Sequence, residues 1–361
     1  MKRQTSQAMI AWAALAGVVG CASPGVQKDQ PVQFVGVTLD RPIWLLGLND
    51  PSWLFDFRKD SAGAKIALVP LADEASNFKV AEEQRENSVG RMTRALPLFI
   101  AERIFLETNC RVTTNILLVR GVGPVVAGKR SSIDALLQSP RDQKPDVIIQ
   151  GAIVRAETES KRLVQVDLWD AIQERIEINS GYVSDAATLG SGAGDLAKEI
   201  IDHLVTSGRC KRVNPPLSWD SPSRDLIDAY VAALGQLLIQ SLAENKFANA
   251  ESIWGEPDML AWYEHLGALM PNSTPVRLIR IRGVLMSRRY GGQGWKAAAD
   301  PVVNDMARTP GGTDDIYRLS PLVLSRLGRE DECRARKADL ATSREPAYTA
   351  WLGRIVCHVP E

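Results

Sequence analysis

The sequence predicts an α+β protein: a mixed β-sheet with flanking helices, followed by an all-α region of helical hairpins. Residues 65–212 alternate short apolar runs with longer segments in which apolar residues recur every three or four positions. A segment at 213–223 contains three prolines, which is typical of a linker. Residues 224–361 then follow the helical period with short breaks. The chain of 361 residues therefore divides into two folded regions.

Strands and helices of the first region are expected in the order β-α-β-α-β-β-β-α. Short runs that are apolar or alternate in polarity predict strands, and apolar residues at helical spacing predict helices. The predicted strands cover 65–71, 111–119, 146–154, 163–170 and 174–183, and the last two form a hairpin. The predicted helices cover 88–108, 131–138 and 195–206. Pro97 is expected to bend the first helix because proline lacks the N–H of a helical hydrogen bond, and Asp195 is expected to cap the third.

The second region is expected to be a series of paired helices. They cover 224–243, 245–254, 259–269, 276–288, 297–308, 316–327 and 330–342, with a final helix or tail over 349–357. The turn at 327–329 resembles the turn between the two helices of a tetratricopeptide repeat. No clean self-similarity at a 34-residue period is present, so the region is expected to be a degenerate, TPR-like array.

The amino terminus has the layout of a secretory signal. Two basic residues at positions 2 and 3 precede an apolar stretch over 8–19 that is too short to span a bilayer. This stretch ends in Val18-Val19-Gly20-Cys21, which resembles the lipobox of bacterial lipoproteins. The resemblance implies that residues 1–20 are a signal peptide and that Cys21 becomes a diacylated amino terminus, carrying fatty acids such as palmitate. The alternative is an ordinary secreted protein with a chance cysteine near its cleavage site.

Residues 21–64 are expected to form a lipid tether and an apolar arm. The polar, turn-rich part up to Pro31 suits a flexible tether. Ala22 stands where an aspartate would favour retention in the inner membrane, so the lipoprotein resemblance implies the outer membrane, with a soluble periplasmic body. The part over 32–60 is rich in tryptophan and leucine. It is expected to pack on the body, and a surface that binds a partner is the alternative.

Several segments of the first region carry a family resemblance. They are Ile66–Leu71 with the long helix after it, Pro145–Val154, Leu163–Ala171 and the helix from Asp195. These segments are similar to the amino-terminal domain of TolB and to domains of CsgG-type, PelC-type and LpoB-type outer-membrane lipoproteins. The resemblance implies a module for binding and assembly that has no catalytic residues. Some of these relatives form rings, so the resemblance leaves a homo-oligomer open.

The cysteines predict two disulfides. The sequence contains five cysteines, and four remain when Cys21 is set aside for the lipid. An even number suits an oxidising compartment such as the periplasm. Each folded region holds one pair, so we expect the bonds Cys110–Cys210 and Cys333–Cys357. Four buried free thiols are the alternative.

Composition and motifs argue against catalysis and nucleic-acid binding. Basic and acidic residues number 43 each, so no charge excess points to nucleic acid. The three histidines have no second ligand at metal-binding spacing, and the chain contains neither a GxSxG elbow nor a Walker loop. Asp167 and Asp170 lack a partner for acid–base work. The glycines at 190–194 precede a helix and are expected to form a flexible loop, with an anion site as the alternative. No catalytic residue, metal or cofactor is expected.

These features together predict a lipid-anchored scaffold or assembly protein on the periplasmic face of a bacterial outer membrane. Its expected partners are other envelope proteins, within an export or surface-structure machine, and an enzyme is not expected. The alternative is an accessory that faces polysaccharide or peptidoglycan, such as a synthase activator or a ring-forming export component. Exposed tryptophans would favour that alternative, because their rings stack on sugars.

Overall fold

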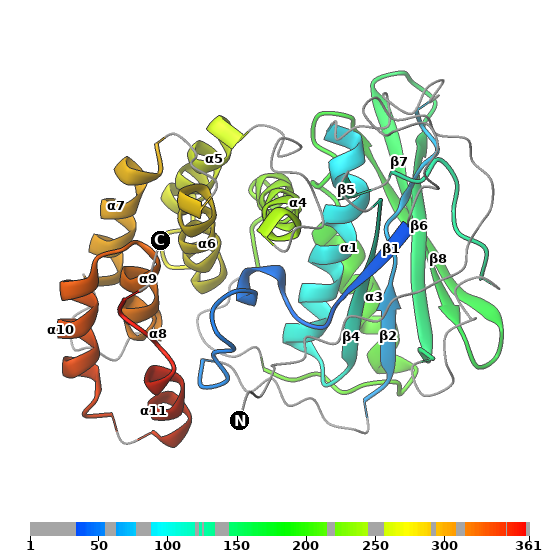
Figure 1. The fold of residues 1–361 in the computed structure, drawn as a ribbon. Coiled ribbons are helices and arrows are strands. Elements are labelled where there is room, and N and C mark those ends of the chain that lie inside the picture. Colours follow the sequence, from blue (N-terminus) through cyan, green and yellow to red (C-terminus); the bar gives the residue numbers. More distant parts are fainter. Residues whose placement is uncertain are drawn as a thin grey trace, which may run out of the picture.

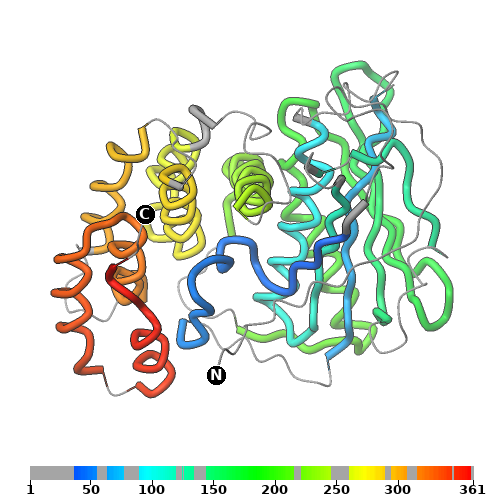
Figure 2. Tube along the Cα trace, in the orientation of Figure 1, coloured from blue at the N-terminus to red at the C-terminus, as the bar shows by residue number. Residues whose placement is uncertain are grey.

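Figure 1 shows the fold as three successive layers: a twisted sheet, the helices α1 and α3 on one of its faces, and a helical region beyond α1. This computed structural model describes residues 34–54, 63–76, 88–119, 123–124, 126–133, 144–214, 221–244, 256–289, 294–307, 315–343 and 345–358. The colour ramp of Figure 2 shows that an amino-terminal segment leaves the sheet and runs to the carboxyl-terminal helices. The segment that follows the first strand therefore lies beside the last helices of the described chain.

The described residues form an eight-stranded mixed sheet. Its main path is β1-β4-β2-β6-β7-β8, and the short strands β3 and β5 pair with β6 and β4. The central strand β2 is parallel to β4 and β6, whereas β1/β4, β6/β7 and β7/β8 are antiparallel pairs. The strands are β1 (Phe34–Leu39), β2 (Lys65–Leu68), β3 (Ala72–Asp73), β4 (Arg111–Val119), β5 (Gly123–Pro124), β6 (Val147–Arg155), β7 (Lys161–Asp170) and β8 (Arg175–Asp185).

Two helices, α1 (Ser88–Glu107) and α3 (Ala193–Thr206), cover one face of the sheet. α1 is buried along most of its length because the sheet lies on one side of it and α4 on the other. Pro97 lies inside α1, as expected from the sequence. α3 is amphipathic, and Gly208, with a φ of 74°, adopts the left-handed conformation that commonly follows a helix end.

The helical region begins with α4 (Ile227–Glu244), which packs on α1 and so joins the two folded regions. α5 and α6 pack together as a hairpin, and α9 and α10 form another. The remaining helices are α5 (Glu256–Leu269), α6 (Thr274–Arg289), α7 (Trp295–Ala307), α8 (Asp315–Arg318), α9 (Ser320–Arg326), α10 (Glu330–Leu340) and α11 (Pro346–Gly353). The predicted α+β class, with its helical-hairpin region, is therefore confirmed.

Most predicted elements agree with the structure where the structure describes them, although the strand expected over 65–71 ends at Leu68. The expected helices over 131–138 and 245–254, and the centre of the linker at 215–220, lie outside the described residues. The predicted single helix over 316–327 is wrong: it is two helices, α8 and α9, because Pro321 has no N–H and stands in the first turn of a new helix. Asp195 is not the cap of α3, since Gly192 occupies that position. Asp195 lies in the first turn, where a carboxylate interacts favourably with the helix dipole.

Candidate functional site

Residues 40–54, which we call the arm, lie between the two folded regions and contact both. The arm follows β1 and contains one short 3-10 helix, Ile43–Leu45. Trp44, Leu48 and Leu54 are buried, as expected for a segment that contributes to the core. The expectation that this apolar segment packs on the body is therefore confirmed for the described part.

A buried carboxylate holds the arm to α1 and α4. Glu102 of α1 is 1% exposed. Its Oε2 accepts a hydrogen bond from Trp44 Nε1 at 2.7 Å, and its Oε1 accepts one from the Tyr230 hydroxyl of α4 at 2.5 Å. Burial, and then the charge of Glu102, raise the pKa of Tyr230 well above its ordinary value, so this hydroxyl stays protonated and donates. One side chain thus links the arm, the sheet region and the helical region.

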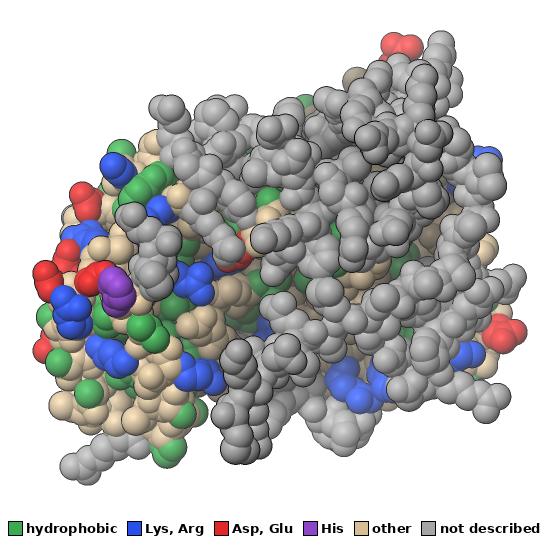
Figure 3. Space-filling model, in the orientation of Figure 1, with side chains coloured by type: hydrophobic (Ala, Val, Ile, Leu, Met, Phe, Trp, Pro, Cys, Tyr) green, Lys and Arg blue, Asp and Glu red, His purple; other side chains and the backbone are tan. Residues whose placement is uncertain are grey.

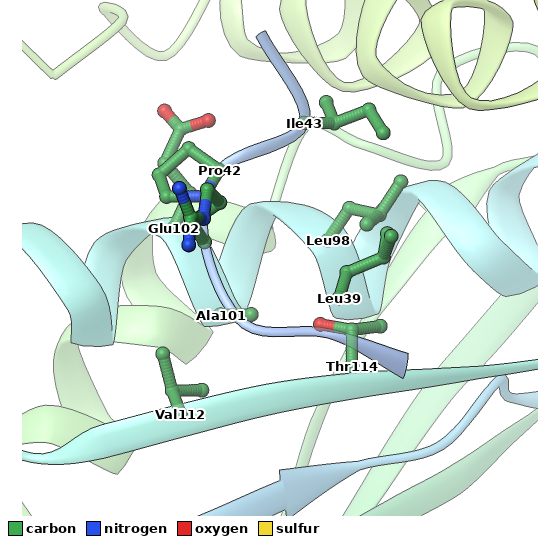
Figure 4. A pocket seen from close by; sticks show the side chains of 9 residues that line it. Leu39, Pro42, Ile43, Leu98, Ala101, Glu102, Val112 and Thr114 are labelled. Carbon is green, nitrogen blue, oxygen red and sulfur yellow. The ribbon is translucent and has the colours of Figure 1, made fainter. Parts of the chain in front are cut away.

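A small hollow lies beside this carboxylate. Figure 4 shows β1 and the arm on one side of it, with α1 and β4 on the others. Its lining includes Leu39, Pro42, Ile43, Leu98, Ala101, Glu102, Val112 and Thr114. The space in it that a water-sized molecule can occupy is about 10 Å³, whereas small-molecule sites have roughly 300–1,000 Å³. The hollow is therefore a packing feature of the arm.

The far end of the arm contacts α11 through aromatic rings. The Trp53 ring lies edge-on to the rings of Tyr348 and Trp351, with centroids 4.9 and 5.2 Å apart. The Arg318 guanidinium of α8 lies 4.5 Å from the Trp53 ring and 4.0 Å from that of Tyr348. Trp351 Nε1 also donates to the carbonyl of Leu48 at 3.1 Å. Ring packing, a cation–π contact and a hydrogen bond thus fix the arm to the last helix.

Asp167 and Asp170 each pair with an arginine, on opposite faces of the sheet. Arg130 Nη1 donates to Asp167 Oδ2 at 2.7 Å, whereas Arg209 donates to Asp170 and, at 2.7 Å, to Glu177. Burial opposes the ionisation of Asp170, but two amides of the following turn and Arg209 outweigh it and hold its pKa below the ordinary value. Because residues three apart on a strand point to opposite faces, the two carboxylates do not form one acid–base pair.

His203 belongs to the same charged cluster as Arg209. Its Nε2 lies 3.1 Å from Glu177 Oε2, and it stands in the last turn of α3. Burial raises the pKa of Glu177, but the hydrogen bonds from Arg209 and His203 outweigh it, so the pKa of Glu177 is lowered. These contacts tie α3 to the β7–β8 hairpin, which is a structural role.

The glycine-rich segment at 190–194 binds a carboxylate of the protein itself. Gly190 N donates to Asp228 Oδ1 of α4 at 2.5 Å. A Cβ at Gly190 would lie 2.8 Å from the Asp228 Cα, so only glycine allows this approach. Burial raises the pKa of Asp228 above its ordinary value, and the amide of Gly190 offsets only part of that effect. The anion expected as an alternative at this loop is therefore a carboxylate of the second region.

The structure brings together both predicted pairs of cysteines. Cys333 and Cys357 form the expected disulfide, with their Cα atoms 5.6 Å apart. Cys110 and Cys210 are adjacent but are two buried free thiols, so the bond expected from the sequence is not formed in this structure. Their thiols share a hydrogen bond that lowers the pKa of Cys210 and raises that of Cys110. Cys21, the expected lipidation site, lies outside the described residues.

Exposed charge on the helical region is mixed in sign. Figure 3 shows Lys and Arg side chains among Asp and Glu over the carboxyl-terminal helices. On α10, acidic residues 330–332 occupy the first turn and Lys337 the last. This arrangement interacts favourably with the helix dipole. Exposed pairs such as Arg334 with Asp331 contribute little to stability. This face is therefore a solvated surface and not a patch of one charge.

Within the described ranges, no group of three or more His, Cys, Asp or Glu residues could hold a metal ion. None of the helices in the described part of the chain combines the length and the apolar character of a membrane span.

No protein-family model matches this chain, and no curated protein matches it. What the fold and these contacts define is an α+β protein with a helical-hairpin region fixed to the sheet region by an amino-terminal arm.

Sequence reasoning did not single out Glu102. The sequence does indicate that Glu102 is buried, since it lies four positions after Leu98 and three before Phe105, on an otherwise apolar face of a predicted helix. A carboxylate on such a face needs buried hydrogen-bond donors, because an unpaired buried charge is costly. The identity of the donors, Trp44 and Tyr230, follows only from the tertiary structure.

Proposed function

We propose that the protein is a lipid-anchored scaffold that holds other envelope proteins at the periplasmic face of the outer membrane. The observation that carries the proposal is the place of the arm. A lipobox-like cysteine, Cys21, precedes a strand of the sheet by about 13 residues, and the arm after that strand is fixed to both folded regions. A lipid at Cys21 would therefore anchor the whole body and not a single loosely attached domain.

The length of the tether supports this role. Thirteen extended residues span at most about 45 Å, so the sheet region would stay close to the membrane surface. A multiply acylated cysteine holds firmly because each buried methylene adds roughly 0.8 kcal/mol. A helical-hairpin region held at a fixed distance from the membrane offers a surface for partner proteins. The sugar-facing alternative draws no support from the six described tryptophans, which are buried or half-buried.

Fractionation of cells that carry Cys21→Ser tests the anchor. We expect the variant to leave the membrane fraction and appear as soluble protein, because its only proposed lipid site is removed. Ala22→Asp is the matched control, since it keeps the cysteine and, by the lipoprotein resemblance, should redirect the protein to the inner membrane. A Cys21→Ser protein that remains in the outer membrane would contradict the proposed anchor.

Affinity purification from detergent-solubilised membranes, followed by mass spectrometry, tests the scaffold role. We expect a small set of envelope proteins to co-purify with the anchored chain and to be depleted with the Cys21→Ser chain, which no longer meets them at the membrane. Recovery of glycan fragments without a protein partner would favour the polysaccharide-facing alternative.

A further inference from the structure

Exposed positive charge gathers at the end of the sheet where β2, β4 and β6 begin. We call this the basic end and define it by its four exposed basic residues, Arg111, Lys144, Arg175 and Lys211. Among the described residues at this end, Glu174 is the exposed acidic one. Figure 3 shows Lys and Arg side chains along the lower edge of the sheet region. The charge there is mostly of one sign, unlike the mixed charge of the helical region.

The strand order places the four basic residues at the same end. Arg111 begins β4, and Arg175 begins β8, opposite the last residue of β7. Lys144 comes three residues before β6, which runs parallel to β2, as β4 does. The amide of Asn109, two residues before Arg111, donates to the carbonyl of Lys211 at 3.1 Å. The basic end therefore extends across the sheet from β4 to β8.

The charges of the basic end are not neutralised by ion pairs. Within the part of the chain that the structure describes, none of the four side chains has an ion pair or a hydrogen bond. The nearby carboxylates are already bound: Asp170 and Glu177 accept from Arg209, and Asp146 Oδ2 accepts from the amide of Lys65 at 2.7 Å. The four basic side chains are therefore available to an anionic partner.

An exposed apolar side chain projects beside these charges. Ile172, in the turn between β7 and β8, is 71% exposed. Asp170 Oδ1 accepts the amides of Ile172 and Gln173 at 2.7 and 2.8 Å, and Glu174 completes the turn with a φ of 54°. Figure 1 places this hairpin turn at the lower end of the sheet. A fixed turn with an apolar tip and basic neighbours is a combination that favours binding to a membrane surface.

The basic residues lie on both faces of the sheet, which indicates a broad, flat partner. Arg111 points away from the helices, because Val112 beside it is in the core under α1. Arg175 lies opposite Asp170, on the face that carries α3 and Arg209. Four strand spacings, about 19 Å, separate β4 from β8. A bilayer meets both faces at once, whereas an acidic peptide bound along one face would leave half of these charges unused.

We infer that the basic end docks on the anionic headgroups of a phospholipid bilayer, with Ile172 entering the headgroup layer. The inference rests on the proposed function, because a lipid at Cys21 would keep the body near the bilayer. The tether is long enough. Phe34 pairs with Val119, eight residues along β4 from Arg111, or about 26 Å. Thirteen extended residues reach up to about 45 Å, so the tether can return along the sheet.

Binding of the Cys21→Ser chain to vesicles tests the contact without the lipid. We expect the chain to sediment with vesicles that contain phosphatidylglycerol more than with phosphatidylcholine alone, and salt should weaken the difference. Lys211→Gln should lower the affinity for the anionic vesicles about fivefold. Lys161→Gln is the matched control, since this exposed lysine begins β7 at the opposite end of the sheet. It should leave the affinity unchanged.

A fluorophore that brightens in apolar surroundings tests the orientation of the anchored chain. Attached through Ile172→Cys, it should brighten on vesicles that contain phosphatidylglycerol and stay dim on phosphatidylcholine alone. The free thiols of Cys110 and Cys210 are buried, so the introduced thiol takes the label. Val183→Cys is the matched control: it is 57% exposed on the same hairpin but lies near the other end of the sheet. Its label should stay dim on both vesicles.

Three results would overturn the inference. One is equal binding of the Cys21→Ser chain to both kinds of vesicle at low salt. Another is an equal loss of affinity with Lys211→Gln and Lys161→Gln. The third is a label at Val183→Cys that brightens as much as the label at Ile172→Cys. Binding of polyglutamate that depends on Lys211, without binding to vesicles, would assign the basic end to an acidic protein instead.

The experiments separate this inference from the proposed function. The sedimentation experiment uses a chain that has no lipid, so its result stands even if Cys21 proves not to be the anchor. Conversely, an anchor confirmed by fractionation, together with no preference for anionic vesicles, would reject the docked orientation and leave the anchored scaffold intact.

Discussion

Asp228 shows how a single half-buried carboxylate can substitute for a bound anion. It joins the start of α4 to the amide of Gly190, just before α3. Its pKa is raised because burial penalises the charged form more than the amide stabilises it. An acid with a raised pKa in the folded state gives stability that is complete below its unfolded pKa of about 3.9. That stability is lost as the pH rises through the folded pKa.

Asp228→Asn should therefore stabilise the protein at neutral pH. The amide side chain keeps an oxygen for the Gly190 N–H but has no charge to desolvate. Urea unfolding between pH 3 and 8 should show the gain at pH 7 and its disappearance towards pH 3.5 or so. Asp225→Asn is the control, since a hydrogen bond from Ser223 lowers the pKa of that carboxyl. Equal stability of Asp228→Asn and the parent chain at pH 7 would show that desolvation of Asp228 is unimportant.

At the scale of elements, the arm is the connection whose loss should change the molecule most. It has little secondary structure, yet it contacts α1 and α4 through Trp44 and contacts α11 through Trp53. A large aromatic ring truncated in a core typically costs about 3–5 kcal/mol. Trp53 lies between α8 and α11, so its truncation would weaken the contact of the arm with the helical region.

Trp53→Ala should destabilise the protein by about 3 kcal/mol and loosen the helical region from the sheet region. We expect faster proteolysis after residue 214 and an unfolding transition that broadens or splits. Trp295→Ala is the control, because the ring of this half-buried tryptophan of α7 contacts Arg288 and Lys296, which lie outside the arm. If both variants lose the same free energy of unfolding and each keeps a single sharp transition, the contact of the arm through Trp53 does not hold the helical region to the sheet region.

The sequence predicts the regular elements well and the connections between them poorly. Residues 111–119 and the β7–β8 hairpin follow from alternation and β-branched composition, which are local signals. The packing of Trp53 on Tyr348 depends on residues almost 300 positions apart, so no local pattern carries it. The break between α8 and α9 was visible in Pro321, but continuous apolar spacing around it favoured one helix. The partners of Glu102 are likewise a tertiary result.

For the molecule as a whole, the core is continuous across the predicted linker. One cluster of buried residues includes Trp44 of the arm, Phe99 of α1, Val166 of the sheet, Leu234 of α4 and Trp351 of α11. Such a shared core favours cooperative unfolding of both regions. The predicted boundary at 213–223 therefore separates two kinds of secondary structure, while the packing joins them.

The pair Cys110 and Cys210 bears on the stability of the whole sheet region, since about 100 residues lie between them. The segments around them run antiparallel, with Thr108 bridged to Arg212 and the amide of Asn109 donating to the carbonyl of Lys211 at 3.1 Å. Continuing that register sets Cys110 opposite Cys210, at a Cα spacing that a disulfide can span. A low-molecular-weight disulfide such as oxidised glutathione would take up the two electrons and two protons that the thiols release.

We expect this oxidation to form a Cys110–Cys210 disulfide in the folded protein. Closing a loop of about 100 residues stabilises by up to roughly 4.7 kcal/mol in the chain-entropy model, so the urea midpoint should rise on oxidation. Non-reducing peptide mapping should find Cys110 linked to Cys210 beside the bond of Cys333 to Cys357. Cys110→Ser should abolish the rise. Cys333→Ser, which removes the other disulfide, should lower the stability whether or not Cys110 and Cys210 are linked, and should leave the rise intact. A link from Cys110 to Cys333 or Cys357 would contradict both the pairing and the antiparallel register that predicts it.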